Sequence, residues 1–413
     1  MKFHILLLSG TLVSTCFAQA EKPERINTTW LARLRAEAAA HHPAATASRE
    51  RARASAAETR SVYLWDDPMV GMSLMAADEM MRRDEGDVRL MIEQAFPKPG
   101  VYQATRAKAA AMRRAGEHQS RATALETGAA AARLAIELAL ADEAILLQQQ
   151  QLDWLREMET NARQRALNPG SSSSEPLRFS AELLKETEML NAAKRTREGI
   201  SQRLNVVLGR KPAATWPGLR LPERSLPIPI ARAEIARIPR SNPQVLAMKS
   251  MKDAAHEEVR LADRERQPGF AITTGTNVYS GGDFRSAEVG VKLNLPWFND
   301  KSYQAKIDAA AHREAAAAAD IETMLREIEG QVVSSIAEAA NAAAQADAYA
   351  GEIDSRTRLA ADSIQSSWIT STATLNELLE SRRLLFSIRL DQRRFIAMQL
   401  AALEDLNLLV PRK

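Results

Sequence analysis

Glu377 and Glu380 are two carboxylate side chains whose spacing would let them act together. They stand three residues apart in a segment with helical character, and that spacing places both carboxylates on one face of a helix. Carboxylates held close together raise one another's pKa and favour the capture of cations. The alternative is an ordinary solvated face on which these carboxylates pair with Arg382 and Arg383.

Methionine and histidine are the remaining candidates for metal ligands. Thioethers suit soft ions such as Cu(I) and Ag(I), and six methionines gather in one stretch: Met69, Met72, Met75, Met80, Met81 and Met91. Methionine more often fills apolar faces, and the six histidines are scattered, with only His41 and His42 adjacent. We therefore assign no metal site and expect no cofactor.

The sequence carries no signature of catalysis. It contains no phosphate-binding glycine loop, no nucleophile elbow and no paired acid/base signal. The serines from Ser171 to Ser174 read as part of a turn. We therefore expect that the protein is not an enzyme. An exported enzyme is less favoured than either of two non-enzymatic functions.

The first twenty residues are typical of a secretory signal peptide. Lys2 precedes an apolar run, and Ala18-Gln19-Ala20 supplies a cleavage site of small residues. The only cysteine of the chain, Cys16, falls inside this segment, where lipidation of Cys16 is the alternative to cleavage. A chain that loses residues 1–20 keeps no thiol for disulfides, catalysis or metal binding.

Composition favours an exported, helix-rich protein. Charges of both signs are interspersed, so a pI near 9.0 reflects no basic tract for nucleic acid. No uninterrupted apolar stretch of eighteen residues follows residue 20, so no transmembrane helix is predicted. Aromatic residues make up only 5% of the chain, which suits close packing of alanine-rich helices.

The chain is an internal duplication with an offset of about 200 residues. Tyr102-Gln103-Ala104 returns as Tyr303-Gln304-Ala305, and His42-Pro43 corresponds to Asn242-Pro243. The expected organisation is a signal peptide at 1–20, a first repeat at 21–210, a proline-rich linker at 211–230 and a second repeat at 231–413.

Each repeat is predicted to contain a helix, a β-hairpin and a long helix pair. Val88, Leu90 and Ile92 alternate with polar neighbours, as do the apolar residues from Val289 to Leu295, and this period of two predicts strands with one apolar and one polar face. The strands are expected at 61–76, 87–96, 269–279 and 287–296, giving hairpins within 61–96 and 268–297. The helix pairs are expected at 103–209 and 303–409.

These elements predict a mainly α-helical protein with a small membrane β part. Strands of about ten residues cross a thin bilayer when tilted, but open sheet edges are not tolerated in lipid. Four strands cannot close a barrel, since even the smallest need about eight. Three chains would pool twelve strands, and their helical hairpins would continue the barrel as a tube.

The order of elements resembles the TolC family of outer-membrane export channels over essentially all of residues 27–410. The matching stretches are Leu293 to Ala305, Asn242-Pro243-Gln244-Val245, and Thr372 to Glu380. The resemblance implies a homotrimer in the outer membrane with its tube in the periplasm, a periplasmic adaptor, and an inner-membrane pump, an RND-type pump being expected. The short chain looks most similar to the heavy-metal efflux branch, so small toxic solutes, with heavy-metal cations among them, are the expected cargo.

The resemblance also implies roles for individual residues. Glu377 and Glu380 occupy positions where the family places acidic rings at the closed periplasmic end, and Trp65, Trp297 and Phe298 fit an aromatic girdle at the membrane interface. The family often has glycine before each tip; Gly170 fits, whereas the second tip has Ser371-Thr372. The competing hypothesis is a soluble periplasmic adaptor or structural rod, which has no need of four two-faced strands.

Overall fold

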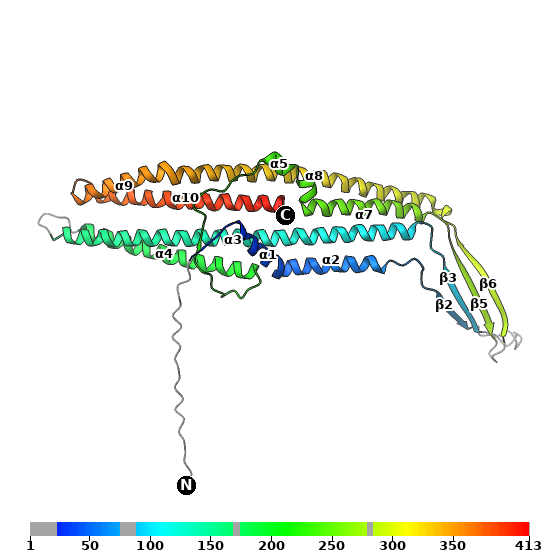
Figure 1. Cartoon of the computed structure of the whole chain (residues 1–413). Helices are drawn as coiled ribbons and strands as arrows, with labels where there is room; N and C mark the ends of the chain where they lie inside the picture. Colours follow the sequence, from blue (N-terminus) through cyan, green and yellow to red (C-terminus); the bar gives the residue numbers. More distant parts are fainter. Residues whose placement is uncertain (1–22, 75–87, 168–173, 279–283, 413) are drawn as a thin grey trace, which may run out of the picture.

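The computed structural model describes residues 23–74, 88–167, 174–278 and 284–412. These residues form an elongated body of long antiparallel helices with a small sheet at one end (Figure 1). The predicted signal peptide with Cys16, the first helical tip around Gly170, and Met75, Met80 and Met81 lie outside the described residues. Among the described helices, none is long and apolar enough to cross a membrane.

The element order repeats itself along the chain. The first half contains β1 (Glu24–Arg25), α1 (Thr28–His41), α2 (Pro43–Ser61), β2 (Met69–Leu74), β3 (Val88–Ala95), α3 (Val101–Arg165) and α4 (Ser174–Val207). The second contains β4 (Leu219–Arg220), α5 (Ala231–Ile235), α6 (Ile238–Ser241), α7 (Pro243–Glu265), β5 (Gly269–Val278), β6 (Phe284–Asn294), the 3₁₀ helix η1 (Pro296–Asn299), α8 (Asp300–Ala348), the π-helical turn η2 (Tyr349–Ile353), α9 (Asp354–Ile369) and α10 (Leu375–Leu409).

Helix capping explains why His42-Pro43 corresponds to Asn242-Pro243 in the duplication. His42 caps α2 by accepting a hydrogen bond from the backbone N–H of Ala44 (3.1 Å), and Asn242 caps α7 by accepting one from Val245 (3.1 Å). A proline follows each cap, at the first helical position, where its missing N–H costs nothing. The pair His42-Pro43 thus ends α1 and begins α2.

The four strands form one antiparallel sheet in the order β2-β3-β5-β6. The central pairing joins the two repeats, with Val88 of β3 opposite Val278 of β5 and Ala95 opposite Ala271. Strands β2 and β6 are the edges, each paired with one neighbour among the described residues. The first strand begins at Met69, later than the predicted residue 61, because α2 continues to Ser61 and Pro68 immediately precedes the strand.

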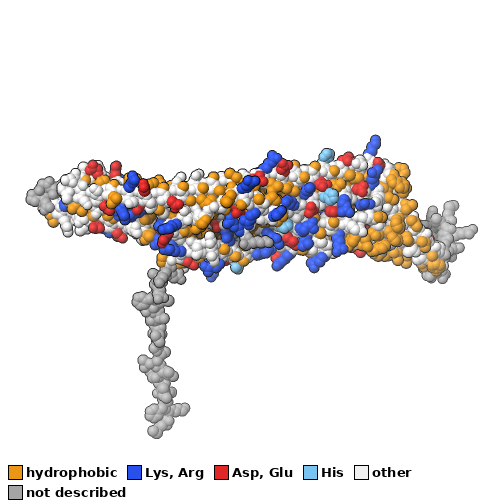
Figure 2. Space-filling model, turned by 45° about the horizontal axis from the view of Figure 1, so that its top comes forward, with side chains coloured by type: hydrophobic (Ala, Val, Ile, Leu, Met, Phe, Trp, Pro, Cys, Tyr) orange, Lys and Arg blue, Asp and Glu red, His pale blue; other side chains and the backbone are white. Residues whose placement is uncertain are grey.

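The sheet has the two chemically different faces that the alternation predicts. Val70, Ile92, Thr274 and Val289 lie opposite one another across the strands, and their neighbours on the same face are mostly apolar. Val70 is 74% exposed and Val289 is 79% exposed. Figure 2 shows hydrophobic side chains gathered at this end of the molecule, whereas charged side chains are interspersed with other side chains along the helical body.

The helices lie side by side. Near the sheet their order is α2-α3-α7-α8, and beyond the middle of the body it is α4-α3-α10 with α8 and α9 next to α10. The long α3 is central in both halves. Helices α2 and α4 are therefore exposed along one side, and α8 and α9 along the other.

Alanine lets the helices approach closely at the centre of the body. Ala131, Ala132, Ala135 and Ala139 of α3 are all buried, in a cluster with residues of α1, α4, α8, α10 and the linker. Larger side chains such as Trp30, Leu31 and Leu138 pack around these alanines, and a second cluster with aromatic side chains lies at the helical tip, far from the sheet. This distribution explains how a chain with few aromatic residues forms a stable core.

The second long rod is interrupted, whereas the sequence predicts a continuous helix from 303 to about 367. The π-helical turn η2 separates α8 from α9, and Gly351 inside it has non-helical angles (φ −93°, ψ −111°). Glycine adopts such angles without the penalty that a side chain would bring. The predicted rod is therefore two helices joined at a kink, as π-helical turns often produce.

Candidate functional site

The tip formed by α9 and α10 packs against the ends of α3 and α4. Its core contains Trp154 and Met158 from α3, Phe179 from α4 and Trp368 from α9. Trp368 is fully buried, and its ring meets that of Phe179 edge to face at 5.7 Å between centroids. Both helical hairpins therefore end in one shared apolar cluster.

Ser371 takes the place that glycine has at many helix ends. Its φ is +64°, and it is the only non-glycine residue with a positive φ among the described residues. The Thr372 N–H donates to the Ser367 carbonyl (2.8 Å) and the Ser371 N–H to the Trp368 carbonyl (3.0 Å). These two bonds form a Schellman motif, so the tip closes tightly without the glycine that the resemblance suggests.

Arg165, at the end of α3, ties the first helical hairpin to this turn. Its Nη1 donates to the Trp368 carbonyl (2.9 Å) and its Nη2 to the Ser371 hydroxyl (3.0 Å). Its guanidinium also lies over the Trp368 ring, 4.5 Å from the centroid. No motif in the sequence marks this residue, because its partners lie about 200 positions away in the chain.

Glu377 has a structural role in capping the start of α10. The Thr374 backbone N–H and the Thr374 hydroxyl both donate to its Oε2 at 2.8 Å, and the Glu377 N–H donates to the Thr374 hydroxyl at 3.3 Å. This is a capping box. The bonds from the Thr374 backbone and side chain hold the pKa of Glu377 below its ordinary value, so it stays charged at neutral pH.

Glu380 lies one turn later, exposed like Glu377, and forms no ion pair with the described residues. Both glutamates line a cavity of about 910 Å³ between α9 and α10, together with Arg356 and Leu384. The two arginines expected as their partners make other contacts, although Arg383 lines the same cavity. Arg383 binds Glu182 of α4 (2.7 Å), and Arg382 lies over the Trp154 ring at 4.9 Å.

Two glutamates of α4 titrate in opposite directions. Burial alone would raise the pKa of Glu182, but hydrogen bonds from Arg383 and Lys185 hold it below its ordinary value. Burial raises the pKa of Glu186, and the nearby charge of Glu182 adds to the effect. Gln148 of α3 donates a hydrogen bond to Glu186, so the buried carboxyl links two helices.

Replacing Glu186 with glutamine is expected to stabilise the protein near neutral pH by roughly 1 kcal/mol. The folded-state pKa of Glu186 lies above the ordinary value of 4.5. The protonated carboxyl therefore contributes fully to stability below pH 4.5, and this contribution is lost as the pH rises through the folded-state pKa. Thermal melts at about pH 4 and pH 7.5 test this. Glu182→Gln should act oppositely, lowering stability at pH 7.5; equal melts for all three proteins there would contradict the assignment.

The polar face of the sheet carries ion pairs between strands. Arg89 of β3 pairs with Glu288 of β6, and Glu93 of β3 pairs with Lys292 of β6. Thr273 and Asn277 of β5 lie between these strands on the same face. Charged side chains on this face find partners within the sheet, so the face suits contact with water.

The described methionines divide between the two faces. Met72 lies opposite Leu90 on the apolar face, whereas Met69 and Met91 lie on the polar face, opposite Glu93 and Gly71. No group of three or more His, Cys, Asp or Glu side chains in the described part of the chain could hold a metal ion. The thioether hypothesis gains no site from these residues.

The three candidate interface aromatics lie where the sheet meets the helices. Trp65, in the segment before β2, contacts Phe96 edge to face at 5.2 Å between ring centroids, and Phe96 stacks on Phe270 at 4.7 Å. Trp297 and Phe298 are in η1 and are 62% and 86% exposed. Their role as a girdle stays a prediction.

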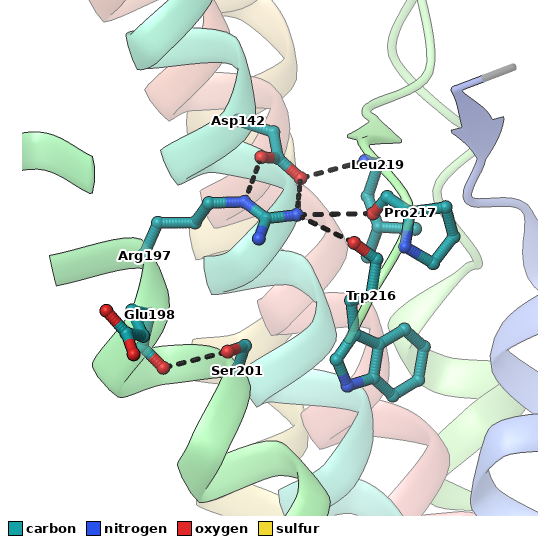
Figure 3. Close-up of polar contacts among 7 residues, drawn as sticks. All are labelled: Asp142, Arg197, Glu198, Ser201, Trp216, Pro217 and Leu219. Carbon is teal, nitrogen blue, oxygen red and sulfur yellow. Dashed lines mark hydrogen bonds and ion pairs between the residues drawn. The ribbon is translucent and has the colours of Figure 1, made fainter. Parts of the chain in front are cut away.

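The predicted irregular linker is held firmly against the helices. As Figure 3 shows, Arg197 of α4 binds Asp142 of α3 and also donates to the carbonyls of Trp216 and Pro217, both at 3.3 Å. The Leu219 N–H donates to the same Asp142 carboxylate at 2.8 Å. Strand β4 then pairs in parallel with β1, so the linker forms a small sheet around the middle of the body.

Comparisons with known proteins agree with this architecture. Residues 235–410 match the family described as outer membrane efflux protein. No curated protein matches the chain by sequence.

Several solved channels share the whole fold. The chain is similar to the outer-membrane channel OprN (TM-score 0.76, 14% identity, covering 99% of this chain and 98% of that one) and to CusC, described as a transmembrane channel (TM-score 0.78, 13% identity, 92% and 91%). It is also similar to the outer membrane protein VceC of Vibrio cholerae (TM-score 0.76, 15% identity, 92% and 96%). The predicted fold, with long helical hairpins and two β-hairpins in a duplicated chain, is confirmed.

Proposed function

We propose that this protein is the outer-membrane channel of an export system, a passive conduit built from three copies of the chain. The observation that carries the proposal is the four-stranded sheet, which has one apolar face and one polar face and continues into long helices. Its two edge strands have no further partner strand among the described residues. A sheet of this kind satisfies its backbone groups in lipid only if its edges are paired.

The edge strands and the outermost helices lie on two opposite sides of the chain. Strand β2 and helices α2 and α4 form one side, and strand β6 and helices α8 and α9 form the other. Joining one side to the other is a head-to-tail contact, which closes into a ring when the rotation permits. Three chains then give twelve strands, an even number within the range of outer-membrane barrels.

The family match of residues 235–410 and the sequence resemblance support the proposed partners and cargo. A periplasmic adaptor and an inner-membrane pump, of the RND type, would drive export, since nothing in the described residues points to an energy-coupling site. Small toxic solutes are the proposed cargo. Heavy-metal cations are the class that the short chain favours, and the sites described above neither require nor select them.

A soluble periplasmic rod is the second candidate. It would account for the helical body but not for the sheet, since a rod gains nothing from exposing Val70, Val289 and their neighbours to water. Apolar surface of this extent in a monomer marks a site of contact with protein or membrane. The channel accounts for both parts of the chain.

Glu377 and Glu380 form the proposed gate ring at the distal tip. Six carboxylates from three chains near one axis would attract cations, so replacing both residues with glutamine is expected to relieve block of single-channel current by divalent cations about tenfold. Glutamine keeps the capping box, because its side-chain oxygen also accepts the Thr374 N–H. The control is Glu322→Gln with Glu329→Gln, two exposed glutamates of α8 that do not line the cavity between α9 and α10. Unchanged block in the Glu377, Glu380 variant would remove these two residues from the gate.

The native mass of the protein extracted from outer membranes in mild detergent tests the assembly. Three chains of 45.5 kDa amount to about 130 kDa after loss of a signal peptide. A trimer that then produces discrete conductance steps in planar bilayers supports the conduit. A monomer or dimer recovered from the periplasm without detergent would favour the soluble rod.

A further inference from the structure

A groove on the middle of the helical body combines positive charge with an apolar floor. Its volume is about 880 Å³, and α1, α3, the α6–α7 joint and the C-terminal residues line it. Five arginines contribute to the lining: Arg35, Arg121, Arg237, Arg240 and Arg412.

The positive charge of the groove is only partly neutralised. Arg35 pairs with Glu404 at 2.5 Å, while Arg237 (3.1 Å) and Arg412 (2.7 Å) share Glu234. Arg121 and Arg240 are exposed and form no ion pair with the described residues. Five guanidinium groups therefore face two carboxylates, and two of the five have unused hydrogen-bond donors.

The floor between these arginines is made of small and apolar side chains. They come from four separate parts of the chain: Ala36, Ala39, Ala124, Pro243, Leu246 and Pro411. A largely apolar cavity of this size with a few polar groups is typical of small-molecule sites, which span about 300–1,000 Å³. The groove suits a ligand with an apolar body and an anionic end.

We propose that this groove binds a dissolved anionic amphiphile, a compact apolar molecule that carries one sulfonate, carboxylate or phosphate group. Arg121 and Arg240 hold the anion through charge-assisted hydrogen bonds, which guanidinium groups form in a fork geometry. The apolar body covers the alanines and Leu246. The remaining three arginines keep their glutamate partners and add a positive field.

The position of the groove excludes a membrane lipid, given the proposed placement of the sheet in the bilayer. Helix α7 begins in the groove at Pro243 and ends at Glu265, four residues before β5, which puts the groove about 33 Å from the sheet at 1.5 Å per residue. Helices α3 and α7 are also central in the chain, so the proposed contacts along α2 and α8 leave the groove open.

The test compares two fluorescent probes that share an aromatic body. Anilinonaphthalene sulfonate carries the anion, and N-phenylnaphthylamine lacks it. The full-length protein is placed in phosphatidylcholine nanodiscs, and the signal of empty nanodiscs is subtracted. The sulfonate probe is expected to bind saturably at one site per chain, and the double variant Arg121→Gln, Arg240→Gln to weaken it at least about tenfold while leaving the neutral probe unchanged.

Two further variants make the result decisive. Arg224→Gln with Arg232→Gln removes two exposed arginines outside the groove that have no ion pair among the described residues, and it should leave both probes unchanged. Ala124→Trp fills the floor and should weaken both probes. Unchanged sulfonate affinity in the Arg121, Arg240 variant, or an equal loss in the Arg224, Arg232 control, would overturn the proposal whether or not the protein is a channel.

Discussion

Replacing Val289 with lysine is expected to abolish assembly in the outer membrane. Val289 lies near the middle of β6 on the apolar face and is 79% exposed. A lysine on the lipid-facing side of a membrane strand costs about 2–4 kcal/mol at the midplane. Three copies of the chain multiply this cost in the proposed trimer. The measurement is the amount of protein recovered from outer membranes as the detergent-extracted trimer.

Ser286→Lys is the matched control for this variant. Ser286 lies on the same strand but on the polar face, opposite Asn277, and is also exposed. A lysine there remains in water, so its trimer yield should equal that of the wild type. Equal yields for Val289→Lys and Ser286→Lys would mean that the apolar face does not contact lipid.

Replacing Arg165 with alanine is expected to shift the distal tip toward an open state. The change removes two hydrogen bonds from a charged donor, to the Trp368 carbonyl and the Ser371 hydroxyl, and uncovers the face of the Trp368 ring. Bonds to charged groups contribute about 1.5–3 kcal/mol each, and Arg165 is partly exposed, so a loss of about 2 kcal/mol is expected. That loss changes a two-state equilibrium up to about 30-fold. Open probability in planar bilayers and entry of large antibiotics into cells both measure it.

Two variants separate the contacts of Arg165 from its charge. Arg165→Lys keeps the charge but cannot bind both oxygens with one planar group, so it should show an intermediate effect. Arg163→Ala removes an exposed arginine two residues earlier, whose ion pair with Glu159 lies within α3, and it should behave like the wild type. If Arg163→Ala raises the open probability as much as Arg165→Ala, the Arg165 contacts do not hold the tip closed.

The sequence alone predicts the duplication and the two-faced strands because both depend on local patterns. Period-two alternation from Val289 to Leu295 determines the faces of β6 whatever the rest of the chain does. The pairs His42-Pro43 and Asn242-Pro243 indicate equivalent helix starts, because capping is a local interaction. These features determine most of the order of the elements and the two faces of the sheet.

The details of the tip depend on contacts between distant parts of the chain, so the sequence does not reveal them. Arg165 and Ser371 come into contact only after both helical hairpins have packed. The positive φ of Ser371 cannot be predicted from the residue type, because serine rarely adopts it. Arg382 and Arg383 look like partners of Glu377 and Glu380, yet Trp154 and Glu182 hold them instead. The kink at Gly351 had one available signal, a glycine inside a long alanine-rich helix.

Disulfide cross-linking between the two edge strands tests the central claim most directly. Single cysteines at Met69, Gly71 or Ser73 of β2 are combined with single cysteines at Ser286 or Glu288 of β6, all on the polar face, with Cys16 changed to serine. Neighbouring strands are close enough for a disulfide where residues lie opposite each other. We predict that at least one pair gives a ladder of covalent species in outer membranes that ends at three chains. A ladder that continues beyond three chains, or no cross-link for any pair, would contradict the closed trimer.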